Sequence, residues 1–255
     1  LISFSRQLKY VRANPKQAAV EVLSPISSYE KTDNWQESMW LEDADCPTAV
    51  ALHEGRLWWA GADRVWASAS DDYENFDIDM EGDAAPILRS IGYGPIDTIN
   101  WVLPLSRLIL GREGSETSVR SSSLDEPLTP TNLSMKDCST KGAAQVPAIK
   151  ADTYGIFVSK SGKKVYELLP DAQVADYVAH DLTRLNTEGA GDGTFTRACA
   201  GMQPDTQVHV VRSDGKVAVL LYDKEDEVEA WWNLETDGVV EDCFTLPKPD
   251  DGDQV

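Results

Sequence analysis

The sequence lacks any long apolar stretch. No run of about twenty apolar residues, the length that a membrane-spanning helix needs, occurs in the 255 residues. The first residues, LISFSRQLKY, also lack the basic-then-apolar pattern of a secretory signal. We therefore expect no membrane contact.

Cysteine and histidine are scarce, with four and three copies. The cysteines are Cys46, Cys138, Cys199 and Cys243, and the histidines are His53, His180 and His209. No C-x-x-C pair occurs, and a zinc ribbon needs ligands paired at short spacing. We expect four reduced, mostly buried thiols in a protein folded in the cytoplasm, with two disulfides as the alternative. No metal or cofactor is predicted.

Basic residues are outnumbered, 23 Lys and Arg against 43 Asp and Glu, which gives a net charge of −20. A domain that grips DNA normally has a basic face, so the composition argues against direct DNA binding. The acidic excess indicates either a solvated surface or a surface that repels polyanions. With 42% hydrophobic and 26% charged residues, the chain belongs to the ordinary globular class.

Motifs for catalysis are also missing. No G-x-S-x-G nucleophile elbow occurs, and pairs of acids are too frequent here to indicate a glycosidase. Arg56, Arg107 and Arg112 are a candidate anion-binding cluster of the sialidase kind, but no repeated Asp-box accompanies them. We predict no enzymatic activity and assign no catalytic residue.

What the sequence does contain is a repeat of about fifty residues. Each copy has an opening β-type run, an apolar hairpin with a Gly-containing turn, and a polar fourth segment. The opening runs begin near Thr48, Asp97, Val146 and Thr196, and a fifth begins near Val239. The hairpins lie at 56–70, 107–121, 154–169 and 207–221. Four strands at this period are typical of the blade of a β-propeller.

The repeat predicts an all-β fold, a β-propeller or partial propeller of about four to five four-stranded blades. A single blade cannot bury its apolar face, so neighbouring blades must pack together. We place the propeller-like domain at 46–247, after an N-terminal arm at 1–45 and before a flexible acidic tail at 248–255. In the arm, Ala18–Leu23 is the predicted strand that closes the ring by completing the last blade.

Two segments leave alternatives open. Residues Val174–Leu185 fit a short helix or, as we prefer, a strand with a loop. The fifth unit stops after VVEDCFTLP and the chain has no initiator Met, so we expect a piece of a longer polypeptide.

The loop at 77–83 places Asp77, Asp79, Glu81 and Asp83 at alternate positions, with Gly82 sixth. Calcium-binding EF-hand loops begin in this way, but they end in a bidentate Glu at the twelfth position, which is Leu88 here. We interpret the loop as a solvated acidic turn and leave calcium as the alternative.

The eight tryptophans permit two interpretations, core packing or stacking on sugars. Trp58, Trp59 and Trp66 lie in a central hairpin, which favours packing in the core or between blades. Trp231 and Trp232 are adjacent, so in a strand one ring must face outward. That ring is a candidate anchor for a protein partner.

Several segments, taken in their order along the chain, resemble a known family of proteins, although no single segment is distinctive. They are CPTAVALHEGRLWWAG, WASASDDYENFDID, DTINWVLPLSRLILGREGSETSVRSSSLDEPLTPTNLSMKD, GIFVSKSGKKVYEL, HDLTRL and QPDTQVHVVRSDGKVAVLLYDKEDEVEAWWNLETDGVVED. Over roughly residues 20–247 the chain resembles phage and prophage tail proteins related to the tail nozzle, or tail tubular protein B, of short-tailed phages. The specificity lies in the order of the segments, since each is plain by itself.

The resemblance implies a propeller-bearing structural subunit of a homo-oligomeric ring at the distal tail. Its partners would be adjacent tail proteins, with phage DNA passing transiently and non-specifically during ejection. The protein would be assembled in the host cytoplasm and located in the virion tail. A carbohydrate-binding or glycoside-processing propeller at the host surface is the alternative, and a general protein-interaction propeller is a third.

The acidic charge suits such a conduit, because acids repel phosphate and let DNA slide. Acids are clustered at 71–83, 223–229 and 250–253. Our hypothesis is that part of this charge faces the channel.

Overall fold

The computed structural model describes residues 46–92, 97–122, 126–184, 186, 191, 193–224, 226, 228–247 and 253–255, and the backbone of two strands before residue 23. These residues form strands, turns and loops. Among them, no helix has the length and apolar character to cross a membrane.

Four antiparallel sheets of four strands each make up the body of the protein. The first sheet contains β3 (Ala49–His53), β4 (Arg56–Gly61), β5 (Arg64–Ala67) and β6 (Ile87–Ser90). The second contains β7 (Ile99–Pro104), β8 (Leu108–Arg112), β9 (Glu116–Ser121) and β10 (Leu133–Ser139).

The third sheet contains β11 (Ile149–Ala151), β12 (Tyr154–Val158), β13 (Val165–Asp171) and β14 (Asp176–Asp181). The fourth contains β15 (Phe195–Gly201), β16 (Gln207–Arg212), β17 (Val217–Asp223) and β18 (Val228–Leu234). All four predicted opening runs and hairpins are confirmed, and Val174–Leu185 holds the strand β14, as preferred.

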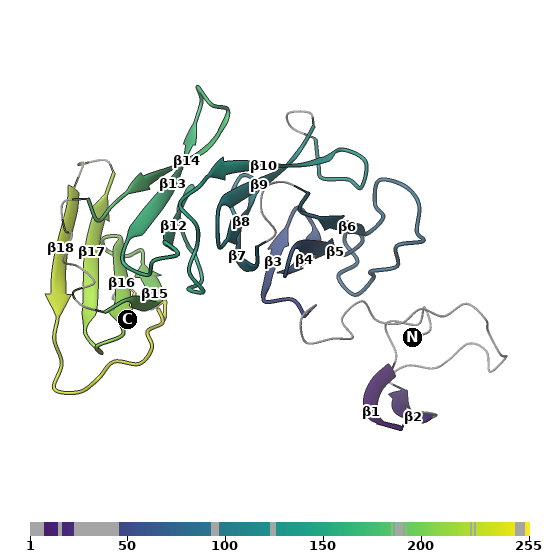
Figure 1. Ribbon diagram of the computed structural model, residues 1–255, viewed down its shortest axis with the longest axis horizontal. Coiled ribbons are helices and arrows are strands. Elements are labelled where there is room, and N and C mark those ends of the chain that lie inside the picture. The colour runs from purple at the N-terminus through teal and green to yellow at the C-terminus, as the bar shows by residue number, and fades with distance from the viewer. Residues whose placement is uncertain are drawn as a thin grey trace.

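Within each sheet the strands follow one another in chain order, as in a propeller blade. The opening strands β3, β7, β11 and β15 lie next to one another from sheet to sheet. The four sheets form an arch with the first and fourth sheets at its two ends (Figure 1). The fold is therefore an open, partial β-propeller.

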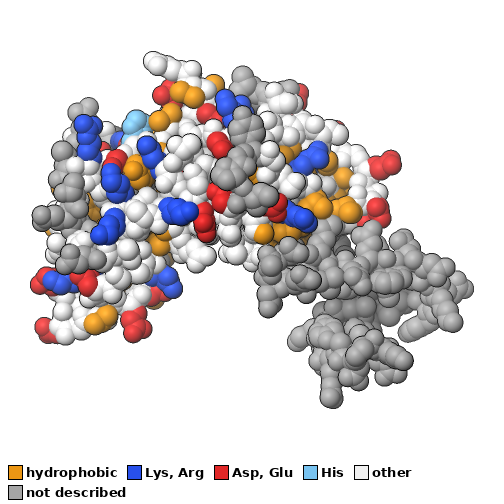
Figure 2. All heavy atoms as spheres, viewed as in Figure 1, with side chains coloured by type: hydrophobic (Ala, Val, Ile, Leu, Met, Phe, Trp, Pro, Cys, Tyr) orange, Lys and Arg blue, Asp and Glu red, His pale blue; other side chains and the backbone are white. Residues whose placement is uncertain are grey.

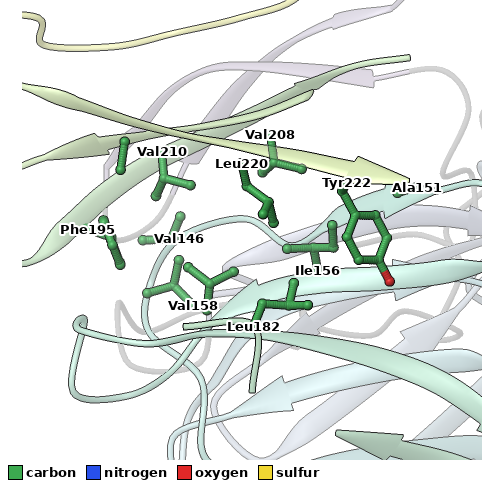
Figure 3. Close-up of a cluster of buried hydrophobic side chains, with 12 residues drawn as sticks. Val146, Ala151, Ile156, Val158, Leu182, Phe195, Val208, Val210, Leu220 and Tyr222 are labelled. Carbon is green, nitrogen blue, oxygen red and sulfur yellow. The ribbon is translucent and has the colours of Figure 1, made fainter. Parts of the chain in front are cut away.

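The core lies between the sheets. Alternate residues of each strand face opposite neighbours, and three apolar clusters fill the three interfaces. Between the third and fourth sheets, Ile156 and Val158 of β12 meet Val208 and Val210 of β16, with Leu220 beside them (Figure 3). Burying one such side chain contributes about 1.5–3 kcal/mol, so each blade is stabilised mainly by its neighbours.

Residues 240–246 lie where the opening strand of a fifth blade would lie. In the second and fourth sheets, the first residue of the opening strand donates its backbone N–H to a carbonyl oxygen in the hairpin turn of the preceding sheet. Val240 donates in the same way to the hairpin turn of the fourth sheet. The bonds are Ile99 N to Ala62 O (2.9 Å), Phe195 N to Gly162 O (2.7 Å) and Val240 N to Gly215 O (3.0 Å). The predicted fifth unit near Val239 thus has its first segment in the expected place. Residues 240–245 form no strand, however, and only Leu246 makes an isolated β-bridge.

The N-terminal strands form a separate hairpin. Strand β1 (Leu8–Asn14) pairs with β2 (Gln17–Val22). Strand β2 matches the predicted strand Ala18–Leu23 up to Val22, and Leu23 lies outside the described residues. It pairs with β1 and, in the described part of the chain, with none of the four sheets, so the structure does not show the predicted ring closure.

The last residues depart from the predicted flexible tail at 248–255. Residues 248–252 lie outside the described residues, but Asp253 accepts hydrogen bonds from Met202 N (2.6 Å) and Gln203 N (3.2 Å). Gln254 forms a β-bridge with Leu246. Backbone N–H groups are good partners for a carboxylate, so even this polar segment is anchored at 253–254.

Candidate interaction surfaces

The three arginines proposed as an anion-binding cluster lie in three separate networks. Arg56 is buried and donates to the backbone oxygens of Ser68, Asp83 and Ala85, each at 2.7 Å. It thereby fixes both ends of the long loop between β5 and β6. Its donors point at carbonyl groups of the same sheet, so the sialidase-like interpretation is wrong for this residue.

Arg107 instead joins two sheets. Its guanidinium lies 2.9 Å from Asp176, whose side chain is buried at the start of β14. Asp176 also accepts a hydrogen bond from Ser118 Oγ (2.8 Å) and lies 3.6 Å from Arg120. A buried carboxylate with several donors is well compensated, and this one ties the third sheet to the second.

Arg112 is buried at the end of β8 and pairs with Asp97 and Asp137. Asp137 also accepts a hydrogen bond from Thr117 Oγ1 (2.7 Å). The neighbouring Glu116 is fully buried, and burial raises the pKa of its carboxyl. These ion pairs therefore join the end of β8 to Asp97, which precedes β7, and to Asp137 of β10. Their role is structural, and they do not form a ligand site.

A further polar contact crosses between the third and fourth sheets. Tyr222 donates its hydroxyl hydrogen to the buried carboxylate of Glu167, which also pairs with Lys224 at 2.8 Å. Burial, followed by the bond to Glu167, raises the pKa of Tyr222. Sequence reasoning missed this contact, because its partners lie 55 positions apart in plain strand sequences.

The acidic loop at 77–83 is exposed between β5 and β6. Asp77 accepts a hydrogen bond from the backbone N–H of Asp79 (3.1 Å), and Gly82 has a positive φ of 104°. No group of three or more His, Cys, Asp or Glu among the described residues is arranged to hold a metal ion. These contacts agree with the solvated acidic turn.

The tryptophan predictions are confirmed in part. Trp58 and Trp66 are buried, whereas Trp59 is half-buried on the opposite side of β4 from Trp58. Trp231 packs against the cluster between the third and fourth sheets and donates its indole N–H to Leu182 O (3.0 Å). Trp232 faces the other way and is 41% exposed. Both residues line a shallow pocket of about 370 Å³ with Asn186, Glu229 and Asn233. Glu229, Trp231 and Asn233 lie on the same side of β18, because side chains alternate along a strand.

The first sheet has an apolar face that points away from the second sheet, which we call the leading face. Its central row runs across all four strands through the paired residues Val50, Trp59, Trp66 and Leu88. On β3, Val50 is 51% exposed and Leu52 is 60% exposed. In Figure 2, hydrophobic side chains gather over this part of the molecule, while Lys and Arg are more frequent over the third and fourth sheets.

The opposite end of the array carries a different apolar face, which we call the trailing face. It consists of the outward side of β18 together with residues 240–246. Leu234 is exposed beside Trp232, and Phe244 is 68% exposed. Large apolar side chains grouped on a surface commonly mark a protein contact, so both ends of the array are candidate interaction surfaces.

No family model matches the chain, and no curated protein matches it. Among solved structures, it is similar to the β-propeller domain of Cps50 (Swd1) from Myceliophteria thermophila. That match has 10% identity and a TM-score of 0.30, and it covers 75% of this chain and 72% of that one.

Proposed function

We propose that this chain is a structural subunit of a phage tail that assembles as a ring around the path of the genome. The proposal rests on the ordered resemblance to tail nozzle proteins and on one structural observation: the two ends of the array carry unlike apolar faces. The buried ion pairs described above join strands and sheets, which suits a structural protein.

Two unlike faces on one protomer favour a ring over a two-fold dimer. A two-fold interface uses the same patch on both copies, whereas a head-to-tail interface pairs different patches and closes into a ring when the rotation between copies divides a full turn evenly. Here the leading face of one copy would meet the trailing face of the next. The subunit would thereby hide exposed groups such as Leu52 and Phe244.

The negative charge would keep DNA moving through such a ring. The acids at 71–83 lie in the connection between β5 and β6. Of the acids at 223–229, Asp223 ends β17, Asp226 follows it and Glu229 lies in β18, while Glu225 and Glu227 are outside the described residues. Most of the third cluster, at 250–253, falls outside the described residues. Like charges repel the DNA backbone and oppose tight binding.

Two double variants test the ring by blocking one face each: Val50→Asp with Leu52→Asp on the leading face, and Leu234→Asp with Phe244→Asp on the trailing face. Mass photometry should show rings for the unmodified chain and monomers for each variant alone. An equal mixture of the two variants should give dimers, since each retains the face that the other lacks.

Val174→Asp is the matched control, because Val174 is equally apolar and exposed but lies in the turn between β13 and β14. It should assemble like the unmodified chain. The proposal fails if the unmodified chain stays monomeric at every concentration, or if both double variants still form rings.

The pocket on the Trp231 side of β18 motivates the carbohydrate-binding alternative. The half-buried indole ring of Trp231, next to Asn186, Glu229 and Asn233, offers a stacking surface and polar partners for sugar hydroxyls. Binding on a glycan array that Glu229→Ala with Asn233→Ala abolishes would favour this function. An array without signal would remove it.

A further inference from the structure

Two cysteines from adjacent blade positions meet at the trailing end of the array. Cys199 lies in β15 and pairs across the sheet with His209 of β16. Cys243 lies in the fifth opening segment, and its Sγ is 3.8 Å from the backbone oxygen of the same His209. Both side chains therefore converge on one point of β16, although 44 positions separate them in the chain.

The two thiols also affect each other's protonation. The neighbouring Cys243 thiol lowers the pKa of Cys199 to about 7, and Cys199 in turn raises the pKa of Cys243. A thiolate is the reactive form of cysteine. The pair thus combines a ready nucleophile with a second thiol beside it. Both cysteines are free in this structure.

The segment that carries Cys243 is held by few bonds. Val240 donates to Gly215 O, Leu246 bridges Gln254, and Val240 and Cys243 pack on a small cluster of Val211, Val217 and Val219. The four complete sheets have three ladders of paired strands each. Within the described part of the chain, this segment has one bridge and an exposed ion pair between Asp242 and Arg197 of β15 at 3.7 Å. A covalent bond would therefore change its stability more than that of any complete strand.

We propose that Cys199 and Cys243 form a reversible dithiol–disulfide pair that fastens residues 240–246 to the fourth sheet. The inference does not depend on the tail role. The thiols stay reduced in the cytoplasm and oxidise outside the cell, where disulfides persist. The other two cysteines differ: Cys46 is exposed, and burial raises the pKa of Cys138 to about 12.

The chemistry is thiol–disulfide exchange with a small disulfide such as glutathione disulfide. The Cys199 thiolate attacks one sulfur of glutathione disulfide, forms a mixed disulfide and releases one glutathione thiolate. Cys243 then loses its proton and attacks the Cys199 sulfur, which releases the second glutathione. Two cysteine thiols are oxidised to one disulfide while one glutathione disulfide is reduced to two thiols.

The test uses the full chain in buffers of increasing oxidised-to-reduced glutathione ratio, followed by alkylation, digestion and mass spectrometry. A peptide pair linked through Cys199 and Cys243 should appear, and it should disappear on return to reduced glutathione. A Cys46→Ser, Cys138→Ser variant should give the same linked pair. Cys243→Ser should instead stop at the mixed disulfide between Cys199 and glutathione, because the thiol that resolves it is missing.

Hydrogen exchange gives a second readout that does not depend on trapping. Amides in 240–246 should exchange about tenfold more slowly in the oxidised protein, because the cross-link restricts local opening. Those in β12 should not change. The proposal is overturned if Cys199 and Cys243 are alkylated separately at every ratio, or if the linked protein exchanges this segment as fast as the reduced protein.

Discussion

At the scale of single residues, the structure depends on buried acids that carry several partners. Asp176 receives hydrogen bonds or ion pairs from Ser118, Arg107 and Arg120, and its side chain is almost fully buried. An exposed pair such as Lys160 with Glu113 has open side chains on both partners. Removing one partner of an exposed pair costs little stability, whereas removing one partner of a buried pair leaves the other charge uncompensated and costs much more.

We predict that Asp176→Ala destabilises the protein by about 3 kcal/mol, since it leaves two partly buried arginines without their counter-charge. Urea unfolding of the variant should show the loss. Lys160→Ala is the control and should leave the midpoint unchanged. Equal effects of the two substitutions would contradict the bridging role of Asp176.

A second prediction concerns pH. Burial raises the pKa of Glu116 above its ordinary value of 4.5, so the folded protein binds the proton more tightly than the unfolded chain. The free energy of unfolding therefore increases as the pH falls from the raised pKa of Glu116 to 4.5, because the folded protein takes up the proton first. At neutral pH the carboxyl is unprotonated in both states, and this contribution is absent.

Glu116→Gln removes the charge and keeps the acceptor for Lys141 N. We expect a higher melting temperature than that of the unmodified chain at about pH 7, and a smaller difference at about pH 5. Thermal scans at the two pH values measure this. A variant that is less stable at both values would show that the Glu116 charge is stabilising.

Residue identities alone could not separate structural arginines from binding ones. Arg56, Arg107 and Arg112 recur near strand ends, as residues of a shared site would. Their partners are set by loops and by the neighbouring sheet: Arg56 by carbonyl groups near Ala85, and Arg107 by Asp176. Such contacts depend on packing between blades, which no local pattern reports.

At the scale of elements, strand pairing depends on a few close contacts. Gly111 of β8 lies directly opposite Trp101 of β7. A Cβ at Gly111 would lie 2.0 Å from the Trp101 ring, so only glycine fits beside the indole. This contact lets the large ring of Trp101 lie in the core between the second and third sheets.

Gly111→Ala should therefore cost about 1–3 kcal/mol of stability through overpacking. Gly92→Ala is the matched control, because a Cβ there meets nothing within 4 Å. Chemical denaturation of the two variants compares them. If both unfold at the same denaturant concentration, the contact between Gly111 and Trp101 does not limit the packing of this sheet.

The elements themselves were predictable because hairpin turns and apolar runs recur at a fixed period. The turn at 160–162 and the strands on either side of it follow from local chemistry. The strand that pairs with β2 could not be predicted, because an isolated strand can form hydrogen bonds with the free edge of any sheet. The meeting of Cys199 and Cys243 had one signal: both lie near the middle of successive opening segments that start at Phe195 and Val240.

At the scale of the whole molecule, the arch presents different chemistry at its ends and a net charge of −20. Asp77, Asp79 and Asp83 lie in an exposed loop of the first sheet. We predict that changing all three to Lys slows genome ejection if they face the channel, because cations bind passing phosphates. Ejection kinetics measured by DNA release check this, and unchanged kinetics remove these residues from the channel wall.

We propose that copies of this arch close into a ring through their leading and trailing faces. Electron microscopy of the purified full-length chain tests it most directly, since averaged images show both the symmetry and the radial order of the blades. We predict closed rings of one size in which each copy contributes one arch. Isolated arches at high protein concentration, or open filaments of variable length, would contradict the claim.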